Sequence, residues 1–443
     1  MGFREDIGSL EQCSCGREHR LKLLVEISEG ALERTPELLE AAGMPKRLHV
    51  TADRDTLAAA DGLPRLLEEA GYTLSWTVYD QMTSATVDAG RALEAELGDA
   101  QGVLAVGTGS VSDVSRVACF TRNLPYAIFG TAPSMDGFAS NSAPMIEKGY
   151  KRTHYGYQPR AVIADTRILA RSPQILKAAG LGDVLGKYIA AADWQVAHLL
   201  TGEYFCPNVC RLVEQSARQA YQLSFHAREE TPQVAGAIME ALVFPGLAME
   251  FCGTTRPASG AEHYLSHCWE VLFLRDHKPP QFHGRKVGVA TVIMADIYKR
   301  LSRVDHPGFR RRPIPVEQLR QFYTTIFPEM EKELEADVLN QVDIQRLAQC
   351  WPQVQQILSR IPDAGLLAEA LEAAGGAVTP EEVQVGAQLA RESLIQCRYI
   401  RNRLTTFRLM DMLEIGDDFC LEALENIHRL FGTKRAEGAR QAT

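Results

Sequence analysis

The chain contains 11 histidines, and four of them fall within 21 residues: His263, His267, His277 and His283. His263 and His267 are four residues apart, so a helix would carry them on one face. His283 opens a second apolar stretch, and two facing helices could direct imidazoles at one point. Imidazole suits Zn, Ni and Fe, and an open catalytic site needs about three protein ligands. The density of the cluster favours a metal site, although a single histidine is more often an ordinary core or surface residue.

A carboxylate that could complete such a site lies elsewhere in the chain. Asp183 stands between glycines in the stretch Ala178–Lys187, where we expect a helix to start. A carboxylate in that position is either a metal ligand or the cap of the helix N-terminus. The local sequence alone favours the cap.

A glycine-rich turn follows a strand of the buried type. Residues Val103–Val106 are apolar, and Gly107-Thr108-Gly109-Ser110-Val111 then leads into a helix. Glycines let the backbone approach a pyrophosphate, and the helix N-terminus supplies N–H groups and a favourable dipole. Because Ser112 replaces the third glycine of the full fingerprint, a tight turn without a ligand is an equally good interpretation.

An aspartate ends an earlier predicted strand. Asp53 follows Thr51 and Ala52, and a carboxylate at that edge can accept hydrogen bonds from a ribose and disfavour a 2′-phosphate. Asp53 therefore favours NAD over NADP. The alternative is that Asp53 or Asp55 caps the helix predicted over residues 55–70.

Cysteines suggest a second, weaker pattern near the N-terminus. The stretch Cys13-Ser14-Cys15-Gly16-Arg17-Glu18-His19 resembles part of a metal knuckle but has no fourth ligand nearby, so we expect a structural turn with reduced thiols. Cys206 and Cys210 lie four apart and are expected in a helix core. Ten scattered cysteines in 443 residues do not form a disulfide scaffold, and a reducing cytoplasm is the expected location.

These residues need a scaffold, and the chain divides into two parts. Up to about residue 170, short β-branched runs alternate with helix-like stretches, which predicts parallel βαβ units and a doubly wound, Rossmann-like sheet. The predicted strands are 21–27, 47–52, 72–79, 102–106, 126–129 and 161–164. We therefore expect an α/β dinucleotide-binding domain over residues 1–170.

The rest of the chain reads as helices. We expect an all-α metal- and substrate-binding domain over residues 171–431, followed by a disordered tail over 432–443. Pro245 and Pro352 fall inside two helical stretches and are expected to kink or split them.

Composition excludes several classes of protein. The net charge of −9 argues against nucleic-acid binding as the main task. No apolar run approaches the roughly 18–20 residues of a membrane span, and the N-terminus is no secretory signal, so we expect no membrane partner.

Taken in order, the motifs resemble those of a known family. They are GTGSVSD at 107–113, TAPSMDGFAS at 131–140, GLGDVLGK at 180–187, SGAEHYLSH at 259–267 and His283-Gly284. The set is similar to the sn-glycerol-1-phosphate dehydrogenases, most of all their bacterial, AraM-like branch. That family belongs to the superfamily of iron-containing alcohol dehydrogenases, glycerol dehydrogenases and dehydroquinate synthases. The resemblance spans about residues 13–400.

The resemblance implies roles for individual residues. It places a divalent metal (Zn, Ni or Fe) on Asp183, His263 and His283, and it places the substrate on Asp136, Asp183 and His267. Of these residues, His267 and Asp136 are the expected catalytic ones. The implied contacts to NAD(H) or NADP(H) are Asp53, Gly107, Thr108, Gly109, Ser110, Val111, Thr131, Ala132, Pro133, Ser134 and Ser140. Thr108 is a departure, because many relatives carry glycine there.

The implied reaction is the reversible reduction of dihydroxyacetone phosphate to sn-glycerol 1-phosphate, in a cleft between the two domains. His267 would deliver a proton to the developing alkoxide, and the phosphate needs cations, for which the candidates are Lys148, Lys151, Arg152 and Lys187. A homodimer is expected from the resemblance alone. The alternatives are a dehydrogenase for glycerol or another unphosphorylated polyol, a lyase like dehydroquinate synthase, and a silent dinucleotide-binding protein.

Overall fold

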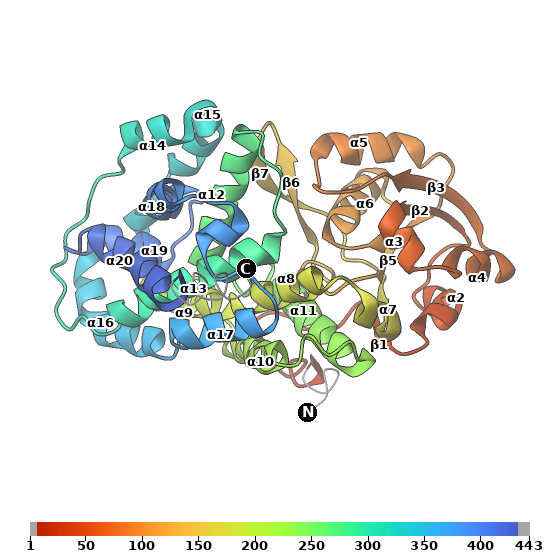
Figure 1. Ribbon diagram of the computed structural model, residues 1–443, viewed down its shortest axis with the longest axis horizontal. Coiled ribbons are helices and arrows are strands. Elements are labelled where there is room, and N and C mark those ends of the chain that lie inside the picture. The colour runs from red at the N-terminus through yellow and green to blue at the C-terminus, as the bar shows by residue number, and fades with distance from the viewer. Residues whose placement is uncertain (1–6, 433–443) are drawn as a thin grey trace, which may run out of the picture.

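The computed structural model describes residues 7–432, and they form two halves side by side (Figure 1). One half is built on a six-stranded sheet of order β1-β8-β5-β4-β2-β3, in which all paired strands are parallel. The strands are β1 (Leu24–Ser28), β2 (Arg47–Asp53), β3 (Thr73–Tyr79), β4 (Gly102–Gly107), β5 (Tyr126–Gly130) and β8 (Ala161–Asp165). The predicted α/β fold class is confirmed.

Helices cover both faces of this sheet because successive strand residues point to opposite sides. In β4, Leu104 and Val106 pack with helices α2 (Ala31–Ala41) and α4 (Leu63–Glu69), whereas Val103 and Ala105 pack with α5 (Val87–Glu96) and α6 (Gly109–Arg122). The central strands β4, β5 and β8 are buried throughout, as expected for a doubly wound sheet. The helices in this half are α2 (Ala31–Ala41), α3 (Arg54–Ala59), α4 (Leu63–Glu69), α5 (Val87–Glu96) and α6 (Gly109–Arg122).

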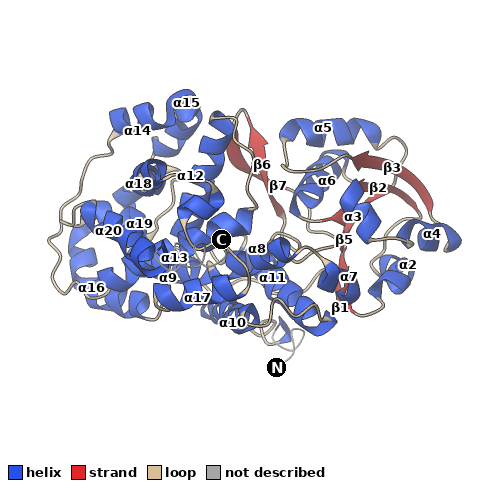
Figure 2. Cartoon of the chain, viewed as in Figure 1, coloured by secondary structure: helices blue, strands red, loops and turns tan. Residues whose placement is uncertain are grey.

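A two-stranded antiparallel hairpin, absent from the sequence prediction, lies between β5 and β8 in the chain and forms a separate sheet. It consists of β6 (Ser142–Glu147) and β7 (Tyr150–Tyr155) and lies between the two halves (Figure 2). Tyr150 is fully buried and donates a hydrogen bond to the carbonyl of Ile400, 2.7 Å away, so the hairpin is attached to the helical half.

The second half is helical, as predicted, and surrounds one large apolar core. Its α-helices are α7 (Thr166–Arg171), α8 (Gln174–Leu185), α9 (Lys187–Thr201), α10 (Pro207–Ser224), α11 (Pro232–Cys252), α12 (Ala261–Arg275), α13 (His283–Leu301), α14 (Val316–Tyr323), α15 (Phe327–Glu331), α16 (Ile344–Ser359), α17 (Ala364–Ala373), α18 (Ala387–Gln396), α19 (Thr406–Leu409) and α20 (Asp418–Ile427). Short 3-10 turns join several of them, and a π-helical turn, His428–Gly432, follows α20.

The structure corrects one expectation about these helices and narrows another, that of a kink or a split at two prolines. Pro245 and Pro352 do not split their helices, because α11 and α16 each continue through the proline. Residues Pro232–Cys252 are also long and apolar enough to cross a membrane, contrary to the expectation that no run approaches that length. Most of this helix is buried inside the protein, which is typical of a core helix.

Helix α11 contributes to the core beside the sheet as well as to the helical half. Met239, Val243 and Phe244 pack in the same cluster as Val103 and Ile128 of the sheet. The two halves therefore share apolar contacts, and a domain boundary at residue 170 stays a prediction. The predicted disordered tail, 432–443, lies almost wholly outside the described residues, which end at 432.

Candidate active site

A cavity of about 1200 Å³ opens between the carboxyl edge of the sheet and helices α12 and α13. The glycine-rich turn after β4 and the loop after β5 line one side of it. The histidines His263, His267 and His283 line the other side. Ligands of doubly wound proteins bind at this edge of the sheet, so the cavity is the candidate active site.

Three side chains from separate helices meet at the wall of this cavity, which His263 and His283 line and behind which Asp183 is fully buried. Asp183 comes from the last turn of α8, His263 from the first turn of α12, and His283 is the first residue of α13. One ligand atom from each lies within 4.8 Å of the other two. The Nε2 atom of His263 is 3.6 Å from Oδ1 of Asp183, and the rings of His263 and His283 have centroids 5.2 Å apart. The residues predicted as metal ligands are thus neighbours in space.

Glycines allow the close approach of α8 and α13 that brings Asp183 to His283. A methyl group on Gly182 would collide with the carbonyl of Gly284, and one on Gly284 would collide with the carbonyl of Ala179. The glycines around Asp183 therefore serve helix packing. Asp183 does not lie at a helix start, as the sequence suggested, because α8 runs through these glycines to Leu185.

Both histidines are oriented by carboxylates behind them. The Nδ1 atom of His263 is 2.7 Å from Oε1 of Glu262, and Nδ1 of His283 is 2.9 Å from Oε1 of Glu270. A carboxylate can only accept, so each Nδ1 is the donor, and Nε2 is the ring nitrogen that can bind a metal when the imidazole is neutral. Such carboxylate–histidine pairs orient imidazoles toward a metal. One carboxylate and two oriented imidazoles fit a divalent transition metal.

The charges around this point favour a cation. Burial alone raises the pKa of Asp183, but the ammonium of Lys187 and the nearby imidazoles outweigh it and hold that pKa well below its usual range. Burial lowers the pKa of His263, but hydrogen bonds with Asp183 and Glu262 raise it to about 9. The pocket thus stabilises positive charge between the carboxylates.

Lys187 bridges two aspartates beneath the metal ligands. Its Nζ atom is 2.6 Å from Oδ2 of Asp136 and 2.9 Å from Oδ1 of Asp183, and it is fully buried. The backbone N–H of Asp136 donates to Oδ2 of Asp183 over 3.0 Å. Burial and the charge of Asp183 raise the pKa of Asp136, against the effect of Lys187. Lys187 is thus an internal ion-pair partner, out of reach of a substrate phosphate.

Glu270, which the sequence analysis missed, connects the histidines to the lysines of the cavity. Its Oε2 atom is 3.0 Å from Nδ1 of His267 and 2.8 Å from Nζ of Lys151. Its Oε1 atom is 3.1 Å from Nζ of Lys286, as well as near His283. Burial lowers the pKa of His267 well below its usual value despite Glu270. Glu270 follows His263 and His267 by seven and three residues, a helical spacing that could have revealed it.

The sheet side of the cavity offers backbone amides and hydroxyls to an anion. Thr108 precedes the first turn of α6, and its side chain makes no capping hydrogen bond. Gly107 has φ +156°, and a side chain there would crowd Thr56 and Val111. Of the predicted dinucleotide contacts, those that line the cavity are Asp53, Thr108, Gly109, Ser110, Thr131, Ala132 and Ser134.

The remaining predicted dinucleotide contacts lie behind this wall: Gly107, Val111, Pro133 and Ser140. Ser140 is fully buried, and its hydroxyl lies 2.7 Å from that of Ser142, which does line the cavity. These four residues can shape the wall through their backbone. Their predicted contacts with the cofactor stay a prediction.

Asp53 both caps a helix and lines the cavity, so the structure is compatible with both interpretations of its place in the sequence. Its Oδ1 atom accepts the N–H of Thr56 over 2.8 Å and caps α3 in a capping box. Asp53 also ends β2 and lines the cavity. The capping role is therefore compatible with a ribose contact.

Cations gather on the helical side of the cavity. The lysines and arginines that line the cavity are Lys151, Arg171, Lys278, Lys286, Arg401 and Arg403. Of the candidates from sequence, only Lys151 is among them. Arg152 pairs instead with Glu329 over 2.5 Å, and Lys148 is exposed at the turn of the hairpin.

The chain has clear relatives among known proteins. A sequence model described as iron-containing alcohol dehydrogenase matches residues 26–173. A glycerol-1-phosphate dehydrogenase [NAD(P)+] of Halalkalibacterium halodurans is 32% identical over 404 residues, which cover 89% of this chain and 94% of the relative. The protein of that name from Geobacillus stearothermophilus is 32% identical over 419 residues, covering 92% and 98%.

A solved structure shows the same fold at lower identity. The glycerol dehydrogenase of Schizosaccharomyces pombe superposes with a TM-score of 0.63 at 15% identity, covering 95% of this chain and 93% of the other. The two sequence relatives match most of the chain at 32% identity, so they show the family as well as the fold. The chain belongs to the glycerol-1-phosphate dehydrogenase family.

Proposed function

We propose that this protein is a metal-dependent, NAD(P)H-linked sn-glycerol-1-phosphate dehydrogenase that reduces dihydroxyacetone phosphate reversibly. The observation that carries the proposal is the meeting of Asp183 with His263 and His283, two residues that line a cavity whose opposite wall is the glycine-rich turn. The naming of its full-length relatives supports the substrate.

Asp183, His263 and His283 would hold the divalent cation, with Glu262 and Glu270 orienting the imidazoles. When bound, such a cation supplies Lewis acidity toward the carbonyl oxygen of the substrate. The nicotinamide cofactor supplies the hydride, and its pyrophosphate would lie at the N-terminus of α6, where Gly109 and Ser110 line the cavity.

Residues of the chain itself would move and hold protons. His267 lines the cavity beside the metal ligands, and its ring centroid is 5.5 Å from that of His283. Because Nδ1 of His267 donates to Glu270, its Nε2 atom can accept a proton from the alcohol during oxidation. In the reverse direction it would donate this proton to the alkoxide that forms from the ketone. Glu270 would stabilise the imidazolium while it exists. The Lys187–Asp136 ion pair would fix the substrate side of the site beneath Asp183.

A substrate phosphate needs cationic side chains in excess of the carboxylates that pair with them. Lys151 and Lys286 share Glu270, while Lys278, Arg401 and Arg403 add further cations around the same wall. We place the substrate phosphate on this wall, because an unphosphorylated polyol would gain nothing from so many cations. We further propose that the protein is located in the cytoplasm and forms a homodimer.

A substrate panel tests the proposal directly. The rate of NADH and NADPH oxidation should be high with dihydroxyacetone phosphate and at least tenfold lower with dihydroxyacetone, since the latter lacks the phosphate. Chiral analysis of the product should give sn-glycerol 1-phosphate. Equal rates with both ketones would favour a glycerol or other polyol dehydrogenase instead.

A further inference from the structure

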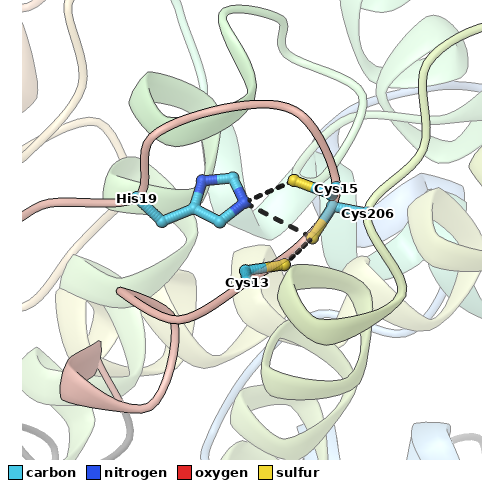
Figure 3. A group of neighbouring side chains, drawn as sticks. All are labelled: Cys13, Cys15, His19 and Cys206. Carbon is cyan, nitrogen blue, oxygen red and sulfur yellow. Dashed lines mark hydrogen bonds between the residues drawn. The ribbon is translucent and has the colours of Figure 1, made fainter.

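The N-terminal segment carries a second cluster of metal-binding side chains, separate from the active-site cavity. It consists of Cys13, Cys15, His19 and Cys206, whose ligand atoms all lie within 4.8 Å of one another. Figure 3 shows the four side chains directed at one point, three from the segment before β1 and one from the start of α10. None of the four lines the cavity.

The distances suit a single tetrahedral ion. The Sγ atoms of Cys13 and Cys206 are 3.5 Å apart, and Nε2 of His19 is 2.9 Å from Sγ of Cys15 and 3.4 Å from Sγ of Cys206. With Zn–S bonds of about 2.3 Å, sulfurs at the corners of a tetrahedron lie about 3.8 Å apart. A disulfide would require about 2.05 Å, so Cys13 and Cys206 are unbonded thiols.

The local backbone is built to bring these ligands together. Gly16 has φ +88°, which permits the tight turn that directs Cys15 and His19 to the same side. Cys206 caps the N-terminus of α10, where the N–H of Val209 donates to its sulfur over 3.5 Å. A helix N-terminus stabilises a thiolate, which is the form that binds a metal.

Further donors surround the sulfurs. Asn208 donates its side-chain N–H to Sγ of Cys13 over 3.3 Å, and the hydroxyl of Tyr204 lies 3.1 Å from Sγ of Cys15. The guanidinium of Arg17 lies 3.9 Å from the ring centre of Tyr204 and donates to the carbonyl of Cys252. Three thiolates and one imidazole around a divalent cation carry a charge of −1, which these donors and Arg17 would balance.

We propose that Cys13, Cys15, His19 and Cys206 bind one structural Zn²⁺. Four protein ligands complete a tetrahedron, so this site has no open position for a substrate, unlike the three-ligand site in the cavity. Thiolates select zinc over the hard cations. The sequence alone predicts a simple turn here, because Cys206 is 187 residues beyond His19 in the chain.

The position of the site indicates what it stabilises. It fastens the N-terminal segment to the connection between α9 and α10, while Arg17 reaches the end of α11. The chain leads from that end through residues 253–260 into α12, which carries His263. The zinc site would thus stabilise the chain segment that leads into α12, without contributing to the chemistry of the active site.

Zinc content per chain tests the proposal in a background without the other site. The full-length His283→Ala variant, purified without added metal under reducing conditions, should contain one zinc per chain by mass spectrometry. Adding Cys206→Ser should remove it. Adding Cys210→Ser should not, because Cys210 lies one turn further along α10 and outside the cluster.

X-ray absorption at the zinc edge keeps the test decisive if the Cys206→Ser protein does not fold. The His283→Ala protein should show three sulfurs at about 2.3 Å and one nitrogen at about 2.0–2.1 Å. A protein without zinc, a zinc with only nitrogen and oxygen neighbours, or a Cys13–Cys206 disulfide under these conditions would overturn the proposal. None of these readouts depends on the reaction proposed for the cavity.

Discussion

Glu270 on α12 accepts a hydrogen bond from Nδ1 of His283 on α13, with 2.9 Å between Oε1 and Nδ1. Glu270 is buried, and the ammonium groups of Lys151 and Lys286 lower its pKa well below the usual range even though burial acts in the opposite direction. This carboxylate therefore stays ionised and holds the imidazole with Nε2 directed at Asp183 and His263.

Removing the charge of Glu270 should weaken metal binding. Glu270→Gln loses the carboxylate that orients His283, and changes of this kind cost about 10–100-fold in metal affinity or activity. Metal titration of the chelated protein, followed by the recovery of activity, measures the loss. Glu329→Gln is the matched control, because Glu329 pairs with Arg152 outside the cavity and should leave the affinity unchanged. An unaltered affinity in Glu270→Gln would show that His283 needs no such support.

His267 should affect the chemical step while leaving the metal in place. His267→Ala removes the group that we expect to exchange the proton, and general acid–base catalysis contributes about 10²–10⁴-fold. We expect kcat with dihydroxyacetone phosphate to fall by about that factor, while metal content and the Kd for NADH stay close to those of the parent. A kcat equal to that of the parent would remove His267 from the proton path.

Asp53 should set the preference between the two nicotinamide cofactors. Its carboxylate lines the cavity at the end of β2, where it would repel a 2′-phosphate. Asp53→Asn keeps a side-chain oxygen for the cap of α3 but removes the charge. The ratio of kcat/KM for NADPH to that for NADH should rise several-fold in this variant, and it should stay constant in Asp88→Asn, whose aspartate is exposed at the start of α5. An unchanged ratio in Asp53→Asn would contradict a ribose-side role.

His49 in β2 should make the folded protein less stable in mild acid. It is buried between the hydroxyls of Ser75 and Thr77, at 2.9 and 2.8 Å, and burial lowers its pKa from about 6.5 although Glu96 acts against this. Below pH 6.5 the unfolded chain therefore binds a proton that the folded chain resists, so stability falls as the pH decreases. This residue can contribute up to about 1.4 kcal/mol per pH unit.

The comparison that isolates His49 uses the thermal midpoints at pH 7.5 and 5.5. The drop between these two values should be smaller in His49→Gln than in the parent. It should be unchanged in His226→Gln, since His226 is an exposed residue. An equal drop in all three proteins would show that His49 does not titrate in this way.

Much of the sheet and of the metal triad could be predicted from sequence because both leave local signals. Strand–helix alternation predicted the six-stranded sheet, and helical spacing placed His263 and His267 on one face. The hairpin Ser142–Tyr155 was missed because it lies between two sheet strands and its sequence mixes charged, polar and apolar residues.

What could not be predicted depends on contacts between distant residues. Nothing near Cys13 in the sequence reveals that Cys206 will lie 3.5 Å away. The glycines at 180 and 182 look like helix breakers, yet they remain helical because α13 and the loop after β5 pack directly on them. The burial of Lys187 between two aspartates likewise follows only from the fold.

The most direct test of the account is the dependence of activity on added divalent metal. Protein dialysed against a chelator should lose NAD(P)H oxidation with dihydroxyacetone phosphate, and added Zn²⁺, Ni²⁺ or Fe²⁺ should restore it. Asp183→Ala should show no recovery with any of the three ions. Full activity after chelation, or recovery in Asp183→Ala equal to that of the parent, would contradict a catalytic cation held by Asp183, His263 and His283.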